Sequence, residues 1–171
     1  MSSVSLHRRP YDDRFLKRYS KEHLKYEIVM FYNTVAYLSG RVSFASLSIQ
    51  ERRFVANLLI HSHALHLRAL IDFLYPGQNL KPTDVIAGDY CSLGVWKKKA
   101  TKLPRRLEKA RGRANKEIAH LTAERIFGSP RRKRWNSRLV AQQIARQLKL
   151  FAKAAESQRL HPTVFQLIQG L

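Results

Sequence analysis

The chain has little cysteine, few acidic residues and no long apolar run. Its 171 residues include a single cysteine, Cys91, which excludes an internal disulfide framework and a zinc site built on several cysteines. No uninterrupted apolar run approaches the roughly 20 residues of a membrane span, and residues 1–15 lack the apolar segment of a secretory signal. We therefore expect a cytoplasmic protein with no membrane partner.

Acidic residues are scarce, because 12 Asp and Glu stand against 32 Lys and Arg, which leaves a net charge of +20. Such an excess repels itself unless a polyanion accepts it. The cations are also clustered: residues 97–134 contain 15 basic and 3 acidic residues. This clustering is typical of a surface that contacts phosphates, and we expect RNA as the partner; a merely soluble basic surface is the alternative. The scattered carboxylates argue against a two-metal nuclease, so no metal or other cofactor is expected.

The length and the 44% hydrophobic content predict one folded domain over residues 1–171. Apolar residues spaced three and four apart predict about four long helices and no strand. We place the first two helices at about 13–39 and 48–75, and the last two at about 104–127 and 136–157. Residues 1–13 are then an N-terminal tail and residues 158–171 a C-terminal extension. The fold class is all-α, a helical bundle with a long connection, residues 76–103, between the second and third helices.

The second predicted helix begins with a capping box, Ser48 and Glu51, and its residues 54–74 are apolar nearly all round. That pattern is typical of a central, buried helix. Arg68 and Asp72, four residues apart, are expected to form an ion pair. The same helix carries three histidines, and buried or interfacial positions are a better interpretation of them than a metal site: His61, His63 and His66.

The third predicted helix brings Arg113 and His120 to one face. Seven residues at 100° each place the two side chains about 20° apart, with Glu117 between them. The apolar residues Ala114 and Ile118 lie opposite, so the pair is expected to point away from the core. The same spacing also suits an ordinary ladder of ion pairs on a helix surface, and that alternative stays open.

The pattern Arg-x6-His resembles the signature of the HEPN superfamily, and the strings NKEIAHLT (115–122) and LRALIDFL (67–74) resemble those of its AbiU2-like phage-defence group. The resemblance covers roughly residues 49–125. The resemblance implies a helical bundle that forms homodimers. It also implies the activity of a metal-independent endoribonuclease that acts as a toxin or defence effector. Its partners would be RNA and a possible antitoxin protein.

Carried over by position, His120 would be the general base that activates the ribose 2′-OH, and the products would carry 2′,3′-cyclic phosphate ends. Arg113 would hold the scissile phosphate and stabilise its developing charge. Four side chains would support this pair: Arg68, Asp72, Asn115 and Glu117. The alternative is a non-catalytic basic helical protein that binds RNA or DNA, or that docks on an acidic partner.

Two tryptophans stand next to cationic runs, where an aromatic ring can stack on an unpaired base while the cations hold the strand. The alternative for each tryptophan is packing of a loop onto the core. The residues expected to bind RNA are Trp96, Lys97, Lys98, Lys99, Arg131, Arg132, Lys133, Arg134 and Trp135.

Gly112 lies inside the third predicted helix, where glycine costs about 1 kcal/mol relative to alanine. Close approach of a second helix or of an RNA backbone would compensate for that cost, and a local kink or the true start of the helix is the alternative. We expect a homodimer in which the third helices, with Gly112 and Arg113, lie at or beside the two-fold axis.

Overall fold

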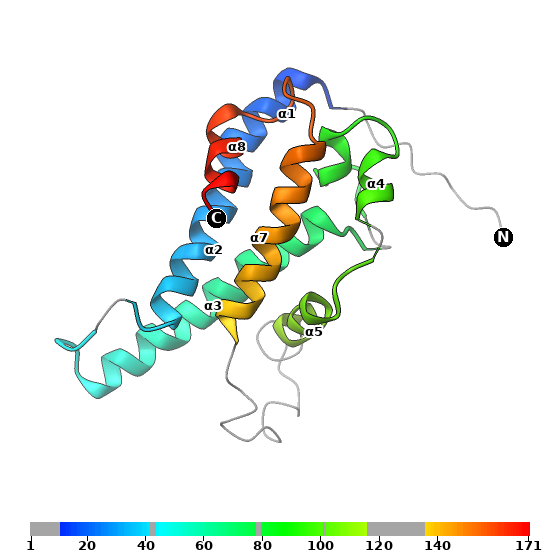
Figure 1. Ribbon diagram of the computed structural model, residues 1–171. Helices are drawn as coiled ribbons and strands as arrows, with labels where there is room; N and C mark the ends of the chain where they lie inside the picture. Colours follow the sequence, from blue (N-terminus) through cyan, green and yellow to red (C-terminus); the bar gives the residue numbers. More distant parts are fainter. Residues whose placement is uncertain (1–10, 42–43, 78–79, 101, 116–135) are drawn as a thin grey trace.

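The computed structural model describes residues 11–41, 44–77, 80–100, 102–115 and 136–171. Within these ranges the chain forms helices and no strand, and the helices pack into a bundle (Figure 1), which confirms the all-α prediction. The core is continuous and draws on every helical segment from the first to the last.

The first helical stretch consists of α1 (Asp13–Tyr19), one turn of π-helix, η1 (Ser20–Leu24), and α2 (Lys25–Leu38). Asp12 caps it by accepting a hydrogen bond from the Phe15 amide at 2.6 Å. The apolar spacing predicted this stretch, and the buried side chains of Ile28 and Phe31 lie on its inner face. The π-turn was not predicted.

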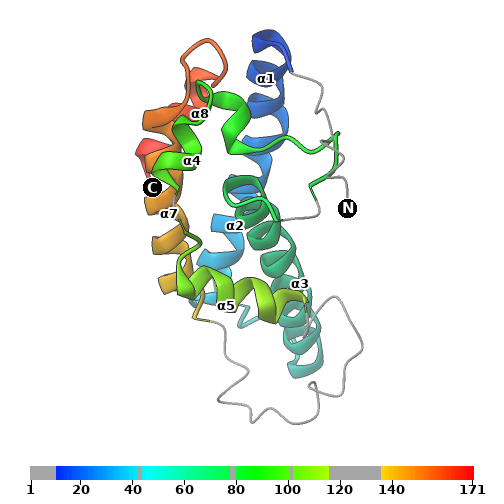
Figure 2. The same ribbon diagram turned by 90° about the vertical axis from the view of Figure 1, so that its right-hand side faces the viewer.

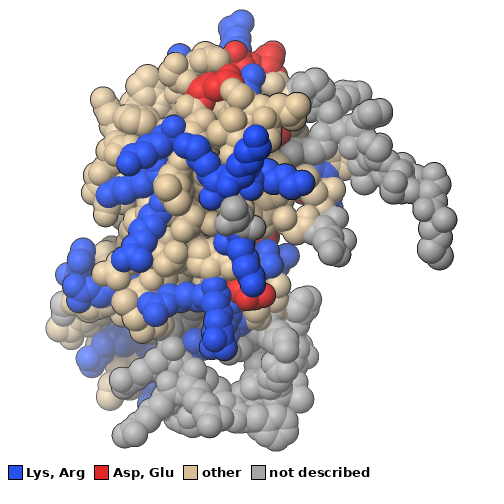
Figure 3. Space-filling model, turned by 45° about the vertical axis from the view of Figure 1, so that its right-hand side comes forward, with Lys and Arg blue, Asp and Glu red and all other residues tan. Residues whose placement is uncertain are grey.

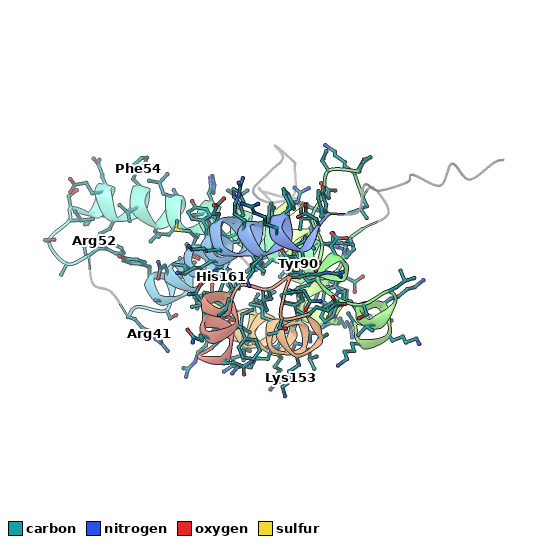
Figure 4. All side chains as sticks on the ribbon, turned by 90° about the horizontal axis from the view of Figure 1, so that it is seen from above. Arg41, Arg52, Phe54, Tyr90, Lys153 and His161 are labelled. Atoms are coloured by element: carbon teal, nitrogen blue, oxygen red, sulfur yellow. The ribbon has the colours of Figure 1, made fainter. Side chains whose placement is uncertain are left out.

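The second stretch is α3 (Ile49–Leu74), and it begins with the predicted capping box of Ser48 and Glu51. The prediction of a helix buried along residues 54–74 was wrong for its first half. Phe54 and Leu58 expose 65% and 52% of their surface. Leu65, further along, exposes 65%, whereas the large apolar side chains from Leu67 to Leu74 are buried. Figure 4 shows Phe54 on the end of α3 that projects beyond the other helices, while Tyr90 lies among the packed side chains.

By length and composition α3 could cross a membrane, and among the described residues it is the one helix that could. Core helices of soluble proteins have the same length and composition, and the second half of α3 is packed within the bundle.

The long connection contains two short helices, the 3-10 helix η2 (Ala87–Tyr90) and α4 (Val95–Lys99). Hydrogen bonds fix both to the bundle. The Tyr90 hydroxyl donates to the Leu16 carbonyl at 3.2 Å, and the Trp96 indole N–H donates to the Leu74 carbonyl at 2.8 Å. The connection is therefore part of the core.

The third and fourth predicted helices appear as α5 (Arg105–Arg113) and α7 (Ser137–Ala154), and the part of the third predicted helix from residue 116 to 127 lies outside the described residues. Pro104 occupies the N-cap of α5. Asn136, at the predicted start of the fourth helix, caps α7 by accepting a hydrogen bond from the Leu139 amide. The helix α5 lies across α3 and α7, and α4 lies beside the upper part of α7 (Figure 2).

The C-terminal extension holds a helix that was not predicted, α8 (Pro162–Gln169). Its Val164 and Ile168 are fully buried. The backbone N–H of His161 donates to the Ser20 hydroxyl at 3.0 Å, so α8 is attached at the π-turn of the first helical stretch.

Candidate functional site

Cations cover one side of the molecule over α4, α5 and α7 (Figure 3). Within Val95–Asn115 and α7, the described residues include one acidic side chain, Glu108. We call the following set the basic face: Lys97, Lys98, Lys99, Lys102, Arg105, Arg106, Lys109, Arg138, Arg146, Lys149 and Lys153. A surface with this many cations and so little opposing charge favours contact with a polyanion.

Trp96 does not belong to this surface. It exposes 5% of its area, its indole N–H bonds to the Leu74 carbonyl, and its ring meets that of Phe151 edge-on with the centroids 5.9 Å apart. The prediction that Trp96 stacks on a base is therefore wrong, because the ring packs α4 onto the core. The neighbouring Lys97, Lys98 and Lys99 are exposed.

A cavity of about 660 Å³ lies between α3, α5, the first helical stretch and the connection; we call it the α3–α5 cavity. Asp72 lines it and forms the predicted ion pair with Arg68, Nε to Oδ2 at 3.5 Å. A second guanidinium, that of Arg111 on α5, lies 3.6 Å from Oδ1 of the same carboxylate. One aspartate thus holds two arginines from different helices at the cavity wall.

Arg111 and Asn115 lie four residues apart and both line the α3–α5 cavity. The amide oxygen of Asn115 is buried and accepts no hydrogen bond from any residue that the structure describes. Arg113, half-buried, is not among the lining residues. The cavity thus brings together Arg68, Asp72 and Asn115 of the predicted site.

The opposite wall of the α3–α5 cavity comes from the first helical stretch. Glu27 lines it, and one of its carboxylate oxygens is bonded to Nδ1 of the buried His66 at 2.7 Å. Tyr19 and His23 lie beside Glu27 in the lining, with their rings 4.8 Å apart. Burial raises the pKa of the Tyr19 hydroxyl, and the nearby negative charge of Glu27 raises it further. Tyr19 is thus kept as a neutral hydrogen-bonding group.

A second cavity, of about 900 Å³, adjoins the first and shares Arg111, Pro76 and Gly77 with it. Lys97 and Lys102 of the basic face line this second cavity. The second cavity therefore connects the basic face to the α3–α5 cavity, and Arg111 lies at the border of the two cavities.

Two of the three histidines of α3, His63 and His66, are buried as expected, whereas His61 is exposed. His63 is buried, its ring stacks on that of Phe31, and its Nδ1 lies 3.1 Å from the Thr34 hydroxyl. Burial and, to a lesser extent, the positive charge of the neighbouring His66 lower the pKa of His63 to about 4. Within the part of the chain that the structure describes, no group of three or more His, Cys, Asp or Glu could hold a metal ion.

Some of the predicted site residues lie outside the described residues. They are Glu117, His120, Arg131, Arg132, Lys133, Arg134 and Trp135. Sequence reasoning also missed three residues that the fold brings into the α3–α5 cavity, namely Tyr19, Glu27 and Arg111. The one sequence feature that could have placed Arg111 in the site is its spacing from Asn115, because residues four apart lie on the same side of a helix.

Comparison with known proteins gives no relative: no protein-family model matches the chain, and neither a curated protein nor a solved structure matches it.

Proposed function

We propose that the protein binds RNA on its basic face and cleaves it without a metal ion, as a HEPN-like endoribonuclease. The observation that carries the proposal is the basic face, which lies over three helices whose described residues include a single acidic side chain, that of Glu108. Phosphates supply the negative charge that such a surface attracts, and binding releases their counterions.

Cleavage is assigned to the end of α5. Arg113 lies there, and the adjoining Arg111 and Asn115 line the α3–α5 cavity. The resemblance to HEPN proteins adds His120 as the general base. In this reaction His120 takes the proton of a ribose 2′-OH, the 2′ oxygen bonds to the adjacent phosphorus, and the bond from phosphorus to the 5′ oxygen breaks. The leaving 5′ oxygen takes a proton from water, so the products are a 2′,3′-cyclic phosphate and a 5′-OH, and Arg113 offsets the charge on the phosphate oxygens.

The binding half of the proposal is tested by the salt dependence of affinity for a labelled single-stranded RNA. The triple variant Lys97→Gln, Lys98→Gln, Lys99→Gln removes three exposed cations of the basic face. If all three contact phosphates, the slope of log K against log salt should flatten by about 2, since each contact to a single strand contributes about 0.7.

A control variant carries the same change in charge on another part of the surface. Lys17, Lys21 and Lys25 are exposed on the first helical stretch, outside the basic face, and their replacement by Gln should leave the slope nearly unchanged. Equal slopes for the two triple variants would contradict the assignment of the basic face, and no measurable RNA binding by the unaltered protein would refute the proposed function.

A further inference from the structure

We propose that the α3–α5 cavity takes up one unpaired base of the bound RNA and favours a base with an exocyclic amino group, that is adenine, cytosine or guanine over uracil. The inference rests on the proposed function, because it places in this cavity one base of an RNA strand whose phosphates lie on the basic face. The size fits: the cavity of about 660 Å³ lies within the usual range of roughly 300 to 1,000 Å³ for small-molecule sites.

The lining suits a flat base with polar edges. Leu70, Phe73 and Ile86 contribute apolar surface, and Tyr19 and His23 add two rings at the wall. Unpaired bases are commonly held between aromatic and apolar side chains and are identified by hydrogen bonds to their edges.

Two acceptors in the cavity call for a donor from the ligand. The buried amide oxygen of Asn115 accepts no hydrogen bond within the described residues, and a buried acceptor without a donor costs free energy. Glu27 receives the hydrogen bond of His66 on Oε2, which leaves its other oxygen, Oε1, to accept. An exocyclic amino group carries two N–H donors and can serve both oxygens, whereas the uracil base of a uridine offers a single N–H, at N3.

The arginines at the cavity wall suit the phosphate next to that base. Arg68 and Arg111 approach each other through Asp72, and their side chains keep 49% and 30% of their surface exposed. Arg111 also lines the second cavity, together with Lys97 and Lys102 of the basic face. A strand that follows these cations from the basic face therefore arrives at the α3–α5 cavity.

The test compares twelve-nucleotide RNAs by fluorescence anisotropy: an all-uridine strand, and the same strand with one central adenosine, cytidine or guanosine. The unaltered protein should bind the substituted strands about tenfold more tightly than the uridine strand. Glu27→Gln and, separately, Asn115→Ala should reduce this preference to less than twofold while the affinity for the uridine strand stays the same. Glu22→Gln makes the same change in charge on η1, outside the lining of the cavity, and should keep the full preference.

The outcomes separate this inference from the proposed function. If all strands bind tightly and equally, or if both cavity variants keep the preference, the base assignment is wrong while RNA binding stands. If no strand binds, both are wrong. Binding of free mononucleotides without any preference among strands would also overturn the inference, because the cavity would then serve a small molecule. Circular dichroism shows whether each variant is folded, and Asn115→Ala leaves the bond between Glu27 and His66 intact.

Discussion

The guanidinium of Arg111 on α5 lies 3.6 Å from the carboxylate of Asp72 on α3, and Arg68 approaches the other oxygen of that carboxylate at 3.5 Å. Two like charges from separate helices are thus held side by side by a single negative charge. Because all three side chains keep 30% to 49% of their surface exposed, solvent screens these pairs. We expect these ion pairs to contribute little to the free energy of unfolding and to have a larger effect on the binding of a negatively charged ligand.

Replacing Asp72 by asparagine should therefore change the free energy of unfolding by less than about 1 kcal/mol. The same variant should tighten RNA binding two- to fivefold at low salt, because two guanidiniums lose a competing anion. Urea denaturation and anisotropy titrations measure the two quantities. Glu22→Gln, which removes an equally exposed acid from the pair with Arg18, serves as the control, and weaker RNA binding by Asp72→Asn would contradict this account.

RNA cleavage should persist in excess EDTA and should depend on His120. His120→Ala should lose orders of magnitude in rate but keep its affinity for RNA, because the basic face is unaltered; Arg113→Ala should lose rate and some affinity. The measurement is a digest of end-labelled RNA by the unaltered protein and both variants.

A matched substrate with a 2′-deoxy sugar at the cleaved position should survive, since the attacking hydroxyl is missing. Cleavage abolished by EDTA, or retained in His120→Ala, would rule out the mechanism. Binding of every RNA tested with no cleavage of any would leave a binding protein without the enzymatic activity.

Gly112→Ala should have opposite effects on the stability of the monomer and on formation of the expected homodimer. A methyl group at Gly112 would meet none of the described residues within 4 Å, and its backbone is helical, so alanine should stabilise the fold by about 0.5 to 1 kcal/mol. If two α5 helices approach closely at Gly112, the same methyl group should weaken dimerisation. Light scattering across a concentration series measures the strength of dimerisation. A variant that is more stable than the unaltered protein yet dimerises as strongly would place the dimer contact elsewhere.

Buried His63 should make stability fall in mild acid. Its pKa is lowered to about 4 in the folded protein, mainly by burial, whereas an unfolded chain has the ordinary value near 6.5. Between these values the unfolded state binds more protons than the folded state, so this contribution is fully present above about pH 6.5 and is lost as the pH falls toward 4. The loss between pH 7 and pH 5 should be about 2 kcal/mol.

The measurement compares urea midpoints of the unaltered protein and His63→Gln at both pH values. The difference in stability between the two proteins should shrink as the pH falls, because the variant lacks the titrating group. His61→Gln, which replaces the exposed histidine of the same helix, should follow the unaltered protein. A constant difference between the unaltered protein and His63→Gln would show that His63 does not cause the acid sensitivity.

Helix ends with strong capping signals could be predicted from the sequence. Ser48 with Glu51 marked the start of α3 correctly, because a capping box depends on residues a few positions apart, and the predicted start of the fourth helix at about residue 136 was also correct. The burial of α3 could not be predicted in the same way. Its apolar residues showed a helix, but only the tertiary packing decides which half of a long helix has neighbours.

The candidate site shows the same division between local and tertiary information. The pair of Arg68 and Asp72 follows from their spacing, and the structure confirms it. Arg111 joins that pair because α5 crosses α3, and Glu27 reaches the same cavity from a helix about forty residues earlier along the chain. No local pattern contains such a meeting of three helices.

The two halves of α3 should differ in how readily their backbone amides exchange with solvent deuterium. Residues near Phe54 and Leu58 lie on the projecting end, where the helix has its capping box and its own hydrogen bonds but little cover. Their amides can exchange through local fraying. Between Leu67 and Leu74 the large apolar side chains are buried against the other helices, so exchange there requires opening of the whole bundle. A single continuous helix thus spans nearly the full range of local stability within the protein.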